Sequence, residues 1–385
     1  MKKFWDKWTE IALVKRILVG LILGAILGIA VPQATGIAIL GDVFVSALKA
    51  IAPLLVFFLV ISSLCNAGKS HGGVIKTVII LYMFSTVLAA VIAVFASMAF
   101  PVKMTLANAA TDTSAPQGIV EVLNNLLLNV VANPVSSLVN ANYVGILMWA
   151  VLLGLAFRAA DKMTKKVLAD VADGISMVVT WIINLAPFGI FGLVFNTVST
   201  NGLDIFTTYG KLLLLLVGCM LFIYFVTNPL LVYWCIRQNP YPLIFHCLKR
   251  SALTAFFTRS SAANIPVNMK VCEEMGLDRD TYSVTIPLGA TINMDGAAIT
   301  ITVMTMATAF TLGIHVDIPT AIILSLLAAL SACGASGVAG GSLLLIPMAC
   351  SLFGISDDIS MQVVAVGFII GVVQDSVETA LNSSS

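Results

Sequence analysis

The chain has 385 residues, of which 59% are hydrophobic and 10% are charged, and its mean hydropathy is +1.03. These values exclude a soluble globular domain, and helix-length apolar segments without the alternation of an outer-membrane barrel predict an all-α polytopic membrane protein. The net charge of +1 comes without any cluster of basic and aromatic residues, so no nucleic-acid partner is expected.

Apolar segments of membrane-spanning length follow one another along the chain. The first six predicted helices are at 12–32, 40–67, 74–101, 120–157 (broken near Asn133 and Pro134), 167–199 and 207–236. Four further apolar segments are at 239–271, 282–312, 319–353 and 360–385. A cytoplasmic N-terminus places 16 of the 20 Lys and Arg residues on the cytoplasmic side, which predicts this orientation by the positive-inside rule. The exceptions are Lys49, Lys103, Lys211 and Arg259.

The segment 239–271 differs from a simple spanning helix because it has basic residues at both ends, Lys249 with Arg250 and then Lys270. Both ends therefore lie on the cytoplasmic side. Its centre, residues 258–266, is polar and turn-like, which predicts a re-entrant helical hairpin. A packing face of small residues between two helices is the alternative interpretation.

The segment 282–312 is interrupted by a polar stretch from Thr291 to Ala298 that contains Asp295. A charged side chain at the centre of a bilayer costs about 2.5–3.5 kcal/mol and needs compensation. Unwound backbone carbonyls beside a carboxylate are typical of sodium sites in secondary transporters. The stretch therefore predicts a broken helix with an ion site, and the alternative is a kinked helix with a structural aspartate.

The segment 319–353 repeats the hairpin pattern from the other side of the membrane, with a tip at 331–342 that is rich in glycine and serine. Small-residue helix packing is again the alternative. Two hairpins that enter from opposite faces, each followed by a spanning helix, indicate an inverted repeat with a substrate site near the membrane midplane.

Charge is unbalanced in the last third of the chain. No Lys or Arg follows Arg279, yet Asp295, Asp375 and Glu378 are expected at membrane depth, where Arg259 is the only basic residue expected. Bound cations or the ammonium group of a substrate would balance the carboxylates, unless one of them is protonated. The oxygen-rich side chains suit an alkali ion, and no His or Cys cluster suggests a transition metal.

The last segment places four polar residues on one helix face, at positions i, i+3, i+4 and i+7. They are Asp375, Glu378, Thr379 and Asn382. Since such a stripe would be strongly disfavoured against lipid, it indicates the wall of a binding site.

With these motifs, the chain resembles the dicarboxylate/amino acid:cation symporter family over essentially its whole length. The resemblance depends on Arg259-Ser260-Ser261, on Asn293-Met294-Asp295-Gly296, on Gly337-Val338, and on the stripe at Asp375, Thr379 and Asn382. It implies the fold of the glutamate transporter homologues, with about eight transmembrane helices and two re-entrant hairpins.

The resemblance also implies binding residues. The substrate would contact the two hairpin tips and the last helix, through Arg259, Ser260, Ser261, Gly337, Val338, Asp375, Glu378, Thr379 and Asn382. Three sodium sites would be formed respectively by Gly289, Asn293 and Asn382; by Thr291, Met294, Ser331, Ala332 and Gly334; and by Tyr82, Ser85, Thr86, Asn293 and Asp295.

Three positions depart from the family pattern. Acidic-substrate members carry an arginine where this chain has Glu378, so we expect a neutral, hydroxylic substrate, as in the bacterial sodium:serine/threonine branch. Ala297 replaces a threonine that relatives often have. The family places an aspartate one turn after Asn382, beyond Ser385, so we expect a truncated chain and an incomplete first sodium site.

The resemblance therefore implies a secondary active transporter, not an enzyme, that takes up serine and threonine with sodium by an elevator-type movement. Residues 1–236 would be mainly a scaffold in a homotrimer, with 74–101 contributing to a transport core formed by 237–385. The expected location is the lipid bilayer of the bacterial cytoplasmic membrane, and sodium is transported cargo rather than a fixed cofactor. Alternatives are a transporter of other neutral amino acids or dicarboxylates, or an ion channel; an intramembrane enzyme is disfavoured because no HExxH or GxSxG motif is present.

Overall fold

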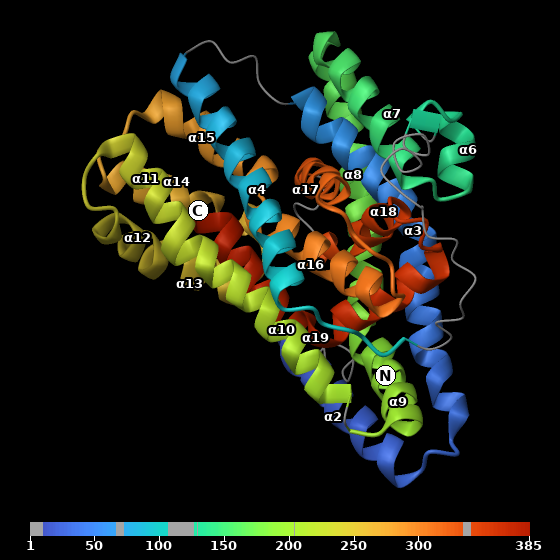
Figure 1. The fold of residues 1–385 in the computed structure, drawn as a ribbon. Helices are drawn as coiled ribbons and strands as arrows, with labels where there is room; N and C mark the ends of the chain where they lie inside the picture. Colours follow the sequence, from blue (N-terminus) through green and yellow to red (C-terminus); the bar gives the residue numbers. More distant parts are fainter. Residues whose placement is uncertain (1–10, 67–72, 107–126, 129, 204, 334–339) are drawn as a thin grey trace.

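The computed structural model of the chain describes residues 11–66, 73–106, 127–128, 130–203, 205–333 and 340–385. All regular elements in these ranges are helical (Figure 1), which confirms the predicted all-α class. Six helical stretches are long and apolar enough to span a membrane: 35–66, 76–99, 162–184, 205–236, 279–311 and 357–384. The described residues thus contain the elements of a multi-pass membrane protein.

The helices of the first half are α2 (Leu13–Ala30), α3 (Ala38–Asn66), α4 (Gly73–Ala99), α6 (Pro134–Val139), α7 (Tyr143–Ala156), α8 (Lys162–Asn184) and α9 (Ala186–Asn201). The boundary predicted near Asn133 is present, because the Asn133 side chain caps the start of α6. The prediction of a single helix at 167–199 is wrong. This segment forms two helices, α8 and α9, which meet at Leu185. Pro187 occupies the first turn of α9, where no intrahelical hydrogen bond needs its missing N–H.

The remaining helices are α10 (Ile205–Phe222), α11 (Asn228–Ile236), α12 (Tyr241–Cys247), α13 (Leu253–Thr258), α14 (Ser261–Glu274), α15 (Arg279–Ile292), α16 (Asp295–Thr311), α17 (Ile318–Ala332), α18 (Ile346–Ser351) and α19 (Asp357–Ser384). One π-helical turn joins α10 to α11 and another joins α12 to α13. The short 3-10 helix η5 (Gly341–Leu345) leads directly into α18.

Both unusual segments predicted in the second half are helical pairs. In the first hairpin α13 ends at Arg259, whose φ of 52° lies in the left-handed region, and α14 starts at Ser261 and packs against α13. In the second hairpin α17 packs against η5 and α18, while the tip residues 334–339 lie outside the described ranges. The predicted interruption between α15 and α16 is confirmed at Asn293 and Met294.

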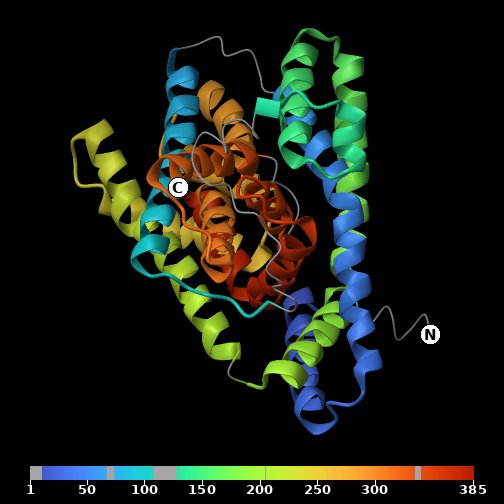
Figure 2. The same cartoon turned by 45° about the vertical axis from the view of Figure 1, so that its right-hand side comes forward.

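The helices pack in two groups. In Figure 2 the blue and green helices of residues 13–66 and 134–201 lie together at the right, beside the orange and red helices of the second half. Within the first group α9 packs along α2, and α3 packs against α7, α8 and α9. In the second group α16 contacts α4, α17 and α19. α10 belongs with this second group by its contacts, because it packs on α19 and α16 more than on α9.

Glycines bring α2 close to α9. Side chains at Gly20, Gly24 and Gly28 would meet backbone oxygens of α9 at 2.2, 2.6 and 3.0 Å. This one-turn spacing of small residues is a common packing device between membrane helices. The two groups are linked elsewhere by Lys49 of α3, which forms ion pairs with Asp357 and Asp358 at the start of α19, at 3.0 and 2.7 Å.

Candidate functional site

The Asp295 carboxylate is fully buried at the start of α16, immediately after the helix break. Its Oδ2 accepts a hydrogen bond from the Ser85 hydroxyl at 2.6 Å, and the Thr86 hydroxyl lies 3.1 Å from its Oδ1. Both hydroxyls come from α4, which packs against α16. No Lys or Arg among the described residues pairs with Asp295, so its charge lacks a protein counter-ion there.

Thr86 connects this carboxylate to two backbone groups. Its Oγ1 lies 2.9 Å from the carbonyl oxygen of Tyr82 and accepts from the N–H of Met294 at 3.4 Å. A hydroxyl has one proton, so Thr86 can donate to the Tyr82 carbonyl or to Asp295 but not to both. One of these two oxygens therefore keeps a lone pair that a cation could use.

Tyr82 lies against the broken helix rather than on the carboxylate. Its hydroxyl donates to the carbonyl of Thr285 in α15 at 3.4 Å. A side chain at Gly289 would come within 2.9 Å of the tyrosine ring, so glycine is needed for this close approach of α4 and α15. The structure thus places Tyr82 and Gly289 in contact, one helix turn from the break.

The amide of Asn293 lies at the break itself. Its Nδ2 donates to the Ser385 hydroxyl at 2.8 Å, while its Oδ1 is buried and has no partner among the described residues. Leaving a buried polar atom unsatisfied costs about 1–3 kcal/mol, so this oxygen is a candidate cation ligand. Asn382 of α19 reaches the same place and accepts from the N–H of Gly296 at 2.7 Å.

The first arm of the second hairpin ends beside the break. The Cys333 thiol lies 3.8 Å from the carbonyl oxygen of Ile292. The hydroxyls of Ser331 and Thr291 are within hydrogen-bond distance of carbonyls one turn earlier in their own helices, as expected for such residues in helices. Met294, which follows Asn293, and Ala332, which follows Ser331, are both buried. The predicted residues Gly334, Gly337 and Val338 lie outside the described residues.

Asp375 is held by the first hairpin tip. Arg259 forms a hydrogen bond through Nε and an ion pair through Nη2, both to Asp375 Oδ2 at 2.6 Å, and the N–H of Gly340 donates to Oδ1 at 3.1 Å. The side chains are 12% and 5% exposed, so this ion pair is buried. The left-handed backbone of Arg259 ends α13 at the position from which the guanidinium reaches α19.

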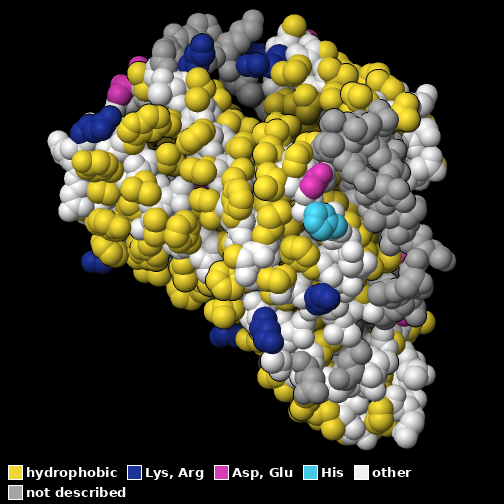
Figure 3. Space-filling view, in the orientation of Figure 1, with side chains coloured by type: hydrophobic (Ala, Val, Ile, Leu, Met, Phe, Trp, Pro, Cys, Tyr) yellow, Lys and Arg dark blue, Asp and Glu magenta, His cyan; other side chains and the backbone are white. Residues whose placement is uncertain are grey.

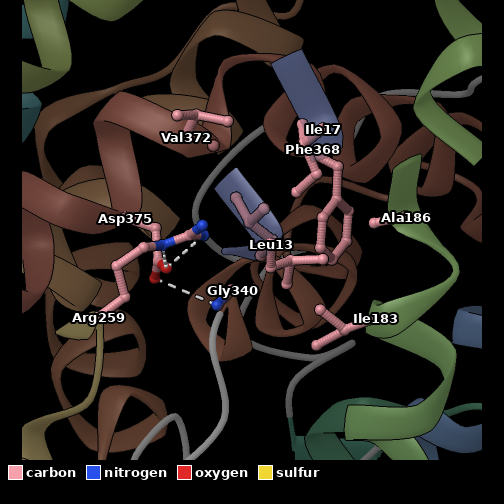
Figure 4. A pocket seen from close by; sticks show the side chains of 11 residues that line it. Leu13, Ile17, Ile183, Ala186, Arg259, Gly340, Phe368, Val372 and Asp375 are labelled. Atoms are coloured by element: carbon pink, nitrogen blue, oxygen red, sulfur yellow. Dashed lines mark hydrogen bonds and ion pairs between the residues drawn. The ribbon is translucent and has the colours of Figure 1, made fainter. Parts of the chain in front are cut away.

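A small cavity separates this ion pair from the first helix group. In Figure 4 the Arg259 side chain points toward Asp375, and the side chains of Leu13, Ile183 and Phe368 lie across the cavity from them. Its volume is about 10 Å³, roughly enough for one water molecule. Any ligand larger than a water molecule could therefore reach Asp375 only if the Arg259 side chain moved.

The Glu378 carboxylate accepts hydrogen bonds from neutral side chains and has no basic partner among the described residues. Its Oε2 accepts from Thr300 of α16 at 2.7 Å, from Ser342 of η5 at 2.8 Å, and from Gln374 one turn earlier at 2.5 Å. Gln374 also donates to the Thr300 hydroxyl at 2.7 Å. A side chain at Gly296 would meet the backbone of Glu378 at 2.9 Å, so α16 and α19 touch here through glycine.

Sequence reasoning missed three members of this cluster. Gln374 could have been found, because it lies four residues before Glu378 on the same helix face. Thr300 and Ser342 carry no such signal, since serine and threonine in apolar helices usually bond their own backbone.

The serines of the first tip have different roles. Ser260 caps α14 by accepting from the N–H of Ala263, whereas Ser261 accepts from the Ser383 hydroxyl of α19 at 3.2 Å. Thr379 is buried in α19 between Glu378 and Asn382. The structure thus brings together the predicted residues of α4, the helix break, the first tip and α19.

The oxygen donors of the cluster favour a hard cation over a transition metal. Among the described residues no group of three His, Cys, Asp or Glu side chains could hold a transition metal. The oxygen atoms around the helix break belong to a carboxylate, hydroxyls, an amide and carbonyls, which hard cations prefer.

The Arg259–Asp375 ion pair gives a direct test of this geometry. Arg259→Ala should lower the free energy of unfolding by about 3–5 kcal/mol, because it leaves a buried carboxylate unpaired. Adding Asp375→Asn should recover part of that loss. Thermal or denaturant unfolding of the two single variants and the double variant in detergent measures the coupling. Additive losses would show that the two side chains do not interact.

Comparison with known proteins places this geometry in a family. Residues 13–385 match the model of the sodium:dicarboxylate symporter family. The chain is 59% identical over 381 residues to the serine/threonine transporter SstT of Bifidobacterium adolescentis, covering 99% of this chain and 89% of the relative. It is 57% identical to the protein of that name from Streptococcus agalactiae and 55% identical to one from Streptococcus thermophilus, each over all of this chain and 96% of the relative. The chain therefore belongs to the sodium:dicarboxylate symporter family, whose members are transporters and not enzymes.

Proposed function

We propose that the protein is a secondary active transporter that couples the inward flow of sodium to uptake of serine and threonine. The observation that carries the proposal is the burial of three carboxylates, Asp295, Asp375 and Glu378, with Arg259 as the one basic partner in the described site. The names of the relatives, which are serine/threonine transporters, support the choice of substrate.

Sodium is assigned to the oxygen atoms around the helix break. One ion would use the Asp295 carboxylate with the hydroxyls of Ser85 and Thr86, and would supply the missing counter-charge. A second would use the unpartnered Oδ1 of Asn293 together with backbone of the break and Asn382. A third is assigned to Thr291, Met294 and the end of α17, where the described contacts offer less support.

The substrate ammonium group is assigned to Asp375. That carboxylate already binds a cationic group in the form of the Arg259 guanidinium, so an ammonium group can take the place of the guanidinium without leaving the buried carboxylate unpaired. Thr379 and Asn382 lie one turn apart on α19, and Ser261 of α14 contacts Ser383 of the same helix. These three residues are assigned to the rest of the amino acid, together with the two hairpin tips.

Glu378 is assigned to the substrate side chain. A carboxylate at this position repels aspartate and glutamate in a poorly solvated site. It accepts three hydrogen bonds at Oε2, and a carboxylate has about four acceptor positions, so it has capacity for a substrate hydroxyl. Serine and threonine provide that hydroxyl.

The two helix groups are assigned to the parts of an elevator. The group formed by α2, α3 and α6–α9 would be the scaffold, in a homotrimer, and α4 with α12–α19 would be the moving core. By its contacts α10 is assigned to the core as well, although its sequence position is in the first part. The membrane is proposed to be the bacterial cytoplasmic membrane, with the N-terminus in the cytoplasm.

Uptake of labelled serine into liposomes containing the purified full-length protein tests the proposal. An inward sodium gradient should drive accumulation, potassium in its place should not, and excess threonine but not glutamate should compete. Accumulation without sodium, or competition by glutamate equal to that by threonine, would contradict it. Sodium current without serine accumulation would identify a channel instead.

The role of Glu378 makes a separate prediction. Glu378→Gln preserves the shape but removes the charge, and a hydrogen bond to a charged acceptor is stronger than one to a neutral acceptor by about 1 kcal/mol. The preference for threonine over alanine in uptake competition should therefore fall about five- to ten-fold. Glu273→Gln, at an exposed position of α14, is the matched control. An unchanged preference in Glu378→Gln would remove Glu378 from substrate recognition.

A further inference from the structure

A large apolar groove lies outside the transport site, between the C-terminal half of α4 with the residues after it and α10. Its volume is about 860 Å³. Phe95, Phe100 and Leu214 line it and are 55%, 69% and 74% exposed. Figure 3 shows the face that carries α4 and α10: hydrophobic side chains cover most of it, and Lys and Arg side chains lie toward its upper and lower edges.

The groove contains one of the basic residues that the positive-inside rule leaves unexplained. Two of these exceptions have carboxylate partners, since Lys49 pairs with α19 and Arg259 pairs with Asp375. Lys103 and Lys211 are exposed and form no ion pair with described residues. Lys211 lines the groove itself, and Lys103 directly follows its lining residue Val102.

Lys211 lies in the second turn of α10, inside a stretch long and apolar enough to span a membrane. An ammonium group at such a position is normally paired, and its long apolar stem can lie along a hydrophobic surface while the charge reaches the headgroup level. An anionic group at the headgroup level would complement this charge, if that group also fits a neighbouring surface that is almost entirely apolar.

We propose that this groove binds an anionic phospholipid, with an acyl chain between α4 and α10 and the phosphate on Lys211, assisted by Lys103. The lining favours a lipid over an extended peptide, because among its described residues Lys211 has the only charged side chain and, apart from the Cys219 thiol, the other side chains are apolar. Gly218 widens the groove, since a side chain built there meets no atom within 4 Å.

Quenching of tryptophan by brominated lipid tests the site directly. The Phe95→Trp variant of the full-length protein carries a tryptophan in the groove. It is reconstituted in two sets of phosphatidylcholine vesicles, one with brominated phosphatidylglycerol and the other with the same mole fraction of brominated phosphatidylcholine. Phe84→Trp is the matched control, because Phe84 is an exposed residue of the same helix that does not line the groove. The fluorescence of the five native tryptophans is measured on the unaltered chain and subtracted.

For Phe95→Trp, brominated phosphatidylglycerol should quench at least about three-fold more than brominated phosphatidylcholine, whereas Phe84→Trp should show no preference. Adding Lys211→Ala should abolish the preference and Lys211→Arg should keep it. Equal quenching by the two lipids, or a preference that survives Lys211→Ala, would overturn the proposal. Quenching by neither lipid would also overturn it and would indicate that a protein segment or a second copy of the chain fills the groove.

Discussion

The burial of a carboxylate without a basic partner is the constraint on which the rest of this structure depends. Asp295 is at the start of α16 and fully buried, and within the described part of the chain its oxygens have hydrogen bonds to the hydroxyls of Ser85 and Thr86 and no ion pair. An uninterrupted helix would offer it no free backbone oxygens, because every carbonyl would be bonded within the helix. The break between α15 and α16 ends one helix directly before Asp295, and the last carbonyls of a helix have no partner within that helix. The sodium proposal follows because a cation satisfies both the charge and the exposed oxygens.

The three buried carboxylates of this region are stabilised in three different ways. Asp295 has two hydroxyls, Asp375 has a guanidinium and a backbone N–H, and Glu378 has three neutral donors. Under the proposed function, each arrangement is assigned a different kind of ligand: a metal cation for Asp295, an ammonium group for Asp375 and a hydroxyl for Glu378. Glycines at 289 and 296 allow α4 and α19 to approach the broken helix closely enough to bring these groups together. The first helix group contributes apolar side chains, such as Leu13 and Ile183, to the cavity beside Asp375.

The sequence predicts the polar features of this fold because each stands out against an apolar background. Asp295 in an apolar run predicts the helix break, and the spacing of Asp375 and Glu378 predicts a shared helix face. The division of α8 from α9 was not predicted, because the apolar pattern continues through Leu185 and only the first-turn position of Pro187 marks the boundary. The Glu378 donors Thr300 and Ser342 were also missed, since their partner is distant in sequence and serine and threonine normally bond their own helices.

Sodium-dependent thermal stabilisation of the purified full-length protein tests the central role of Asp295 most directly. Unfolding is measured in detergent as sodium replaces potassium at constant ionic strength, because a ligand that binds only the folded state stabilises it by RT ln(1 + [L]/Kd). Sodium should raise the melting temperature of the unaltered chain progressively, and Asp295→Asn should lose most of that rise while still folding. Equal stabilisation by potassium, or an undiminished sodium response in Asp295→Asn, would contradict the assignment of a sodium ion to this carboxylate.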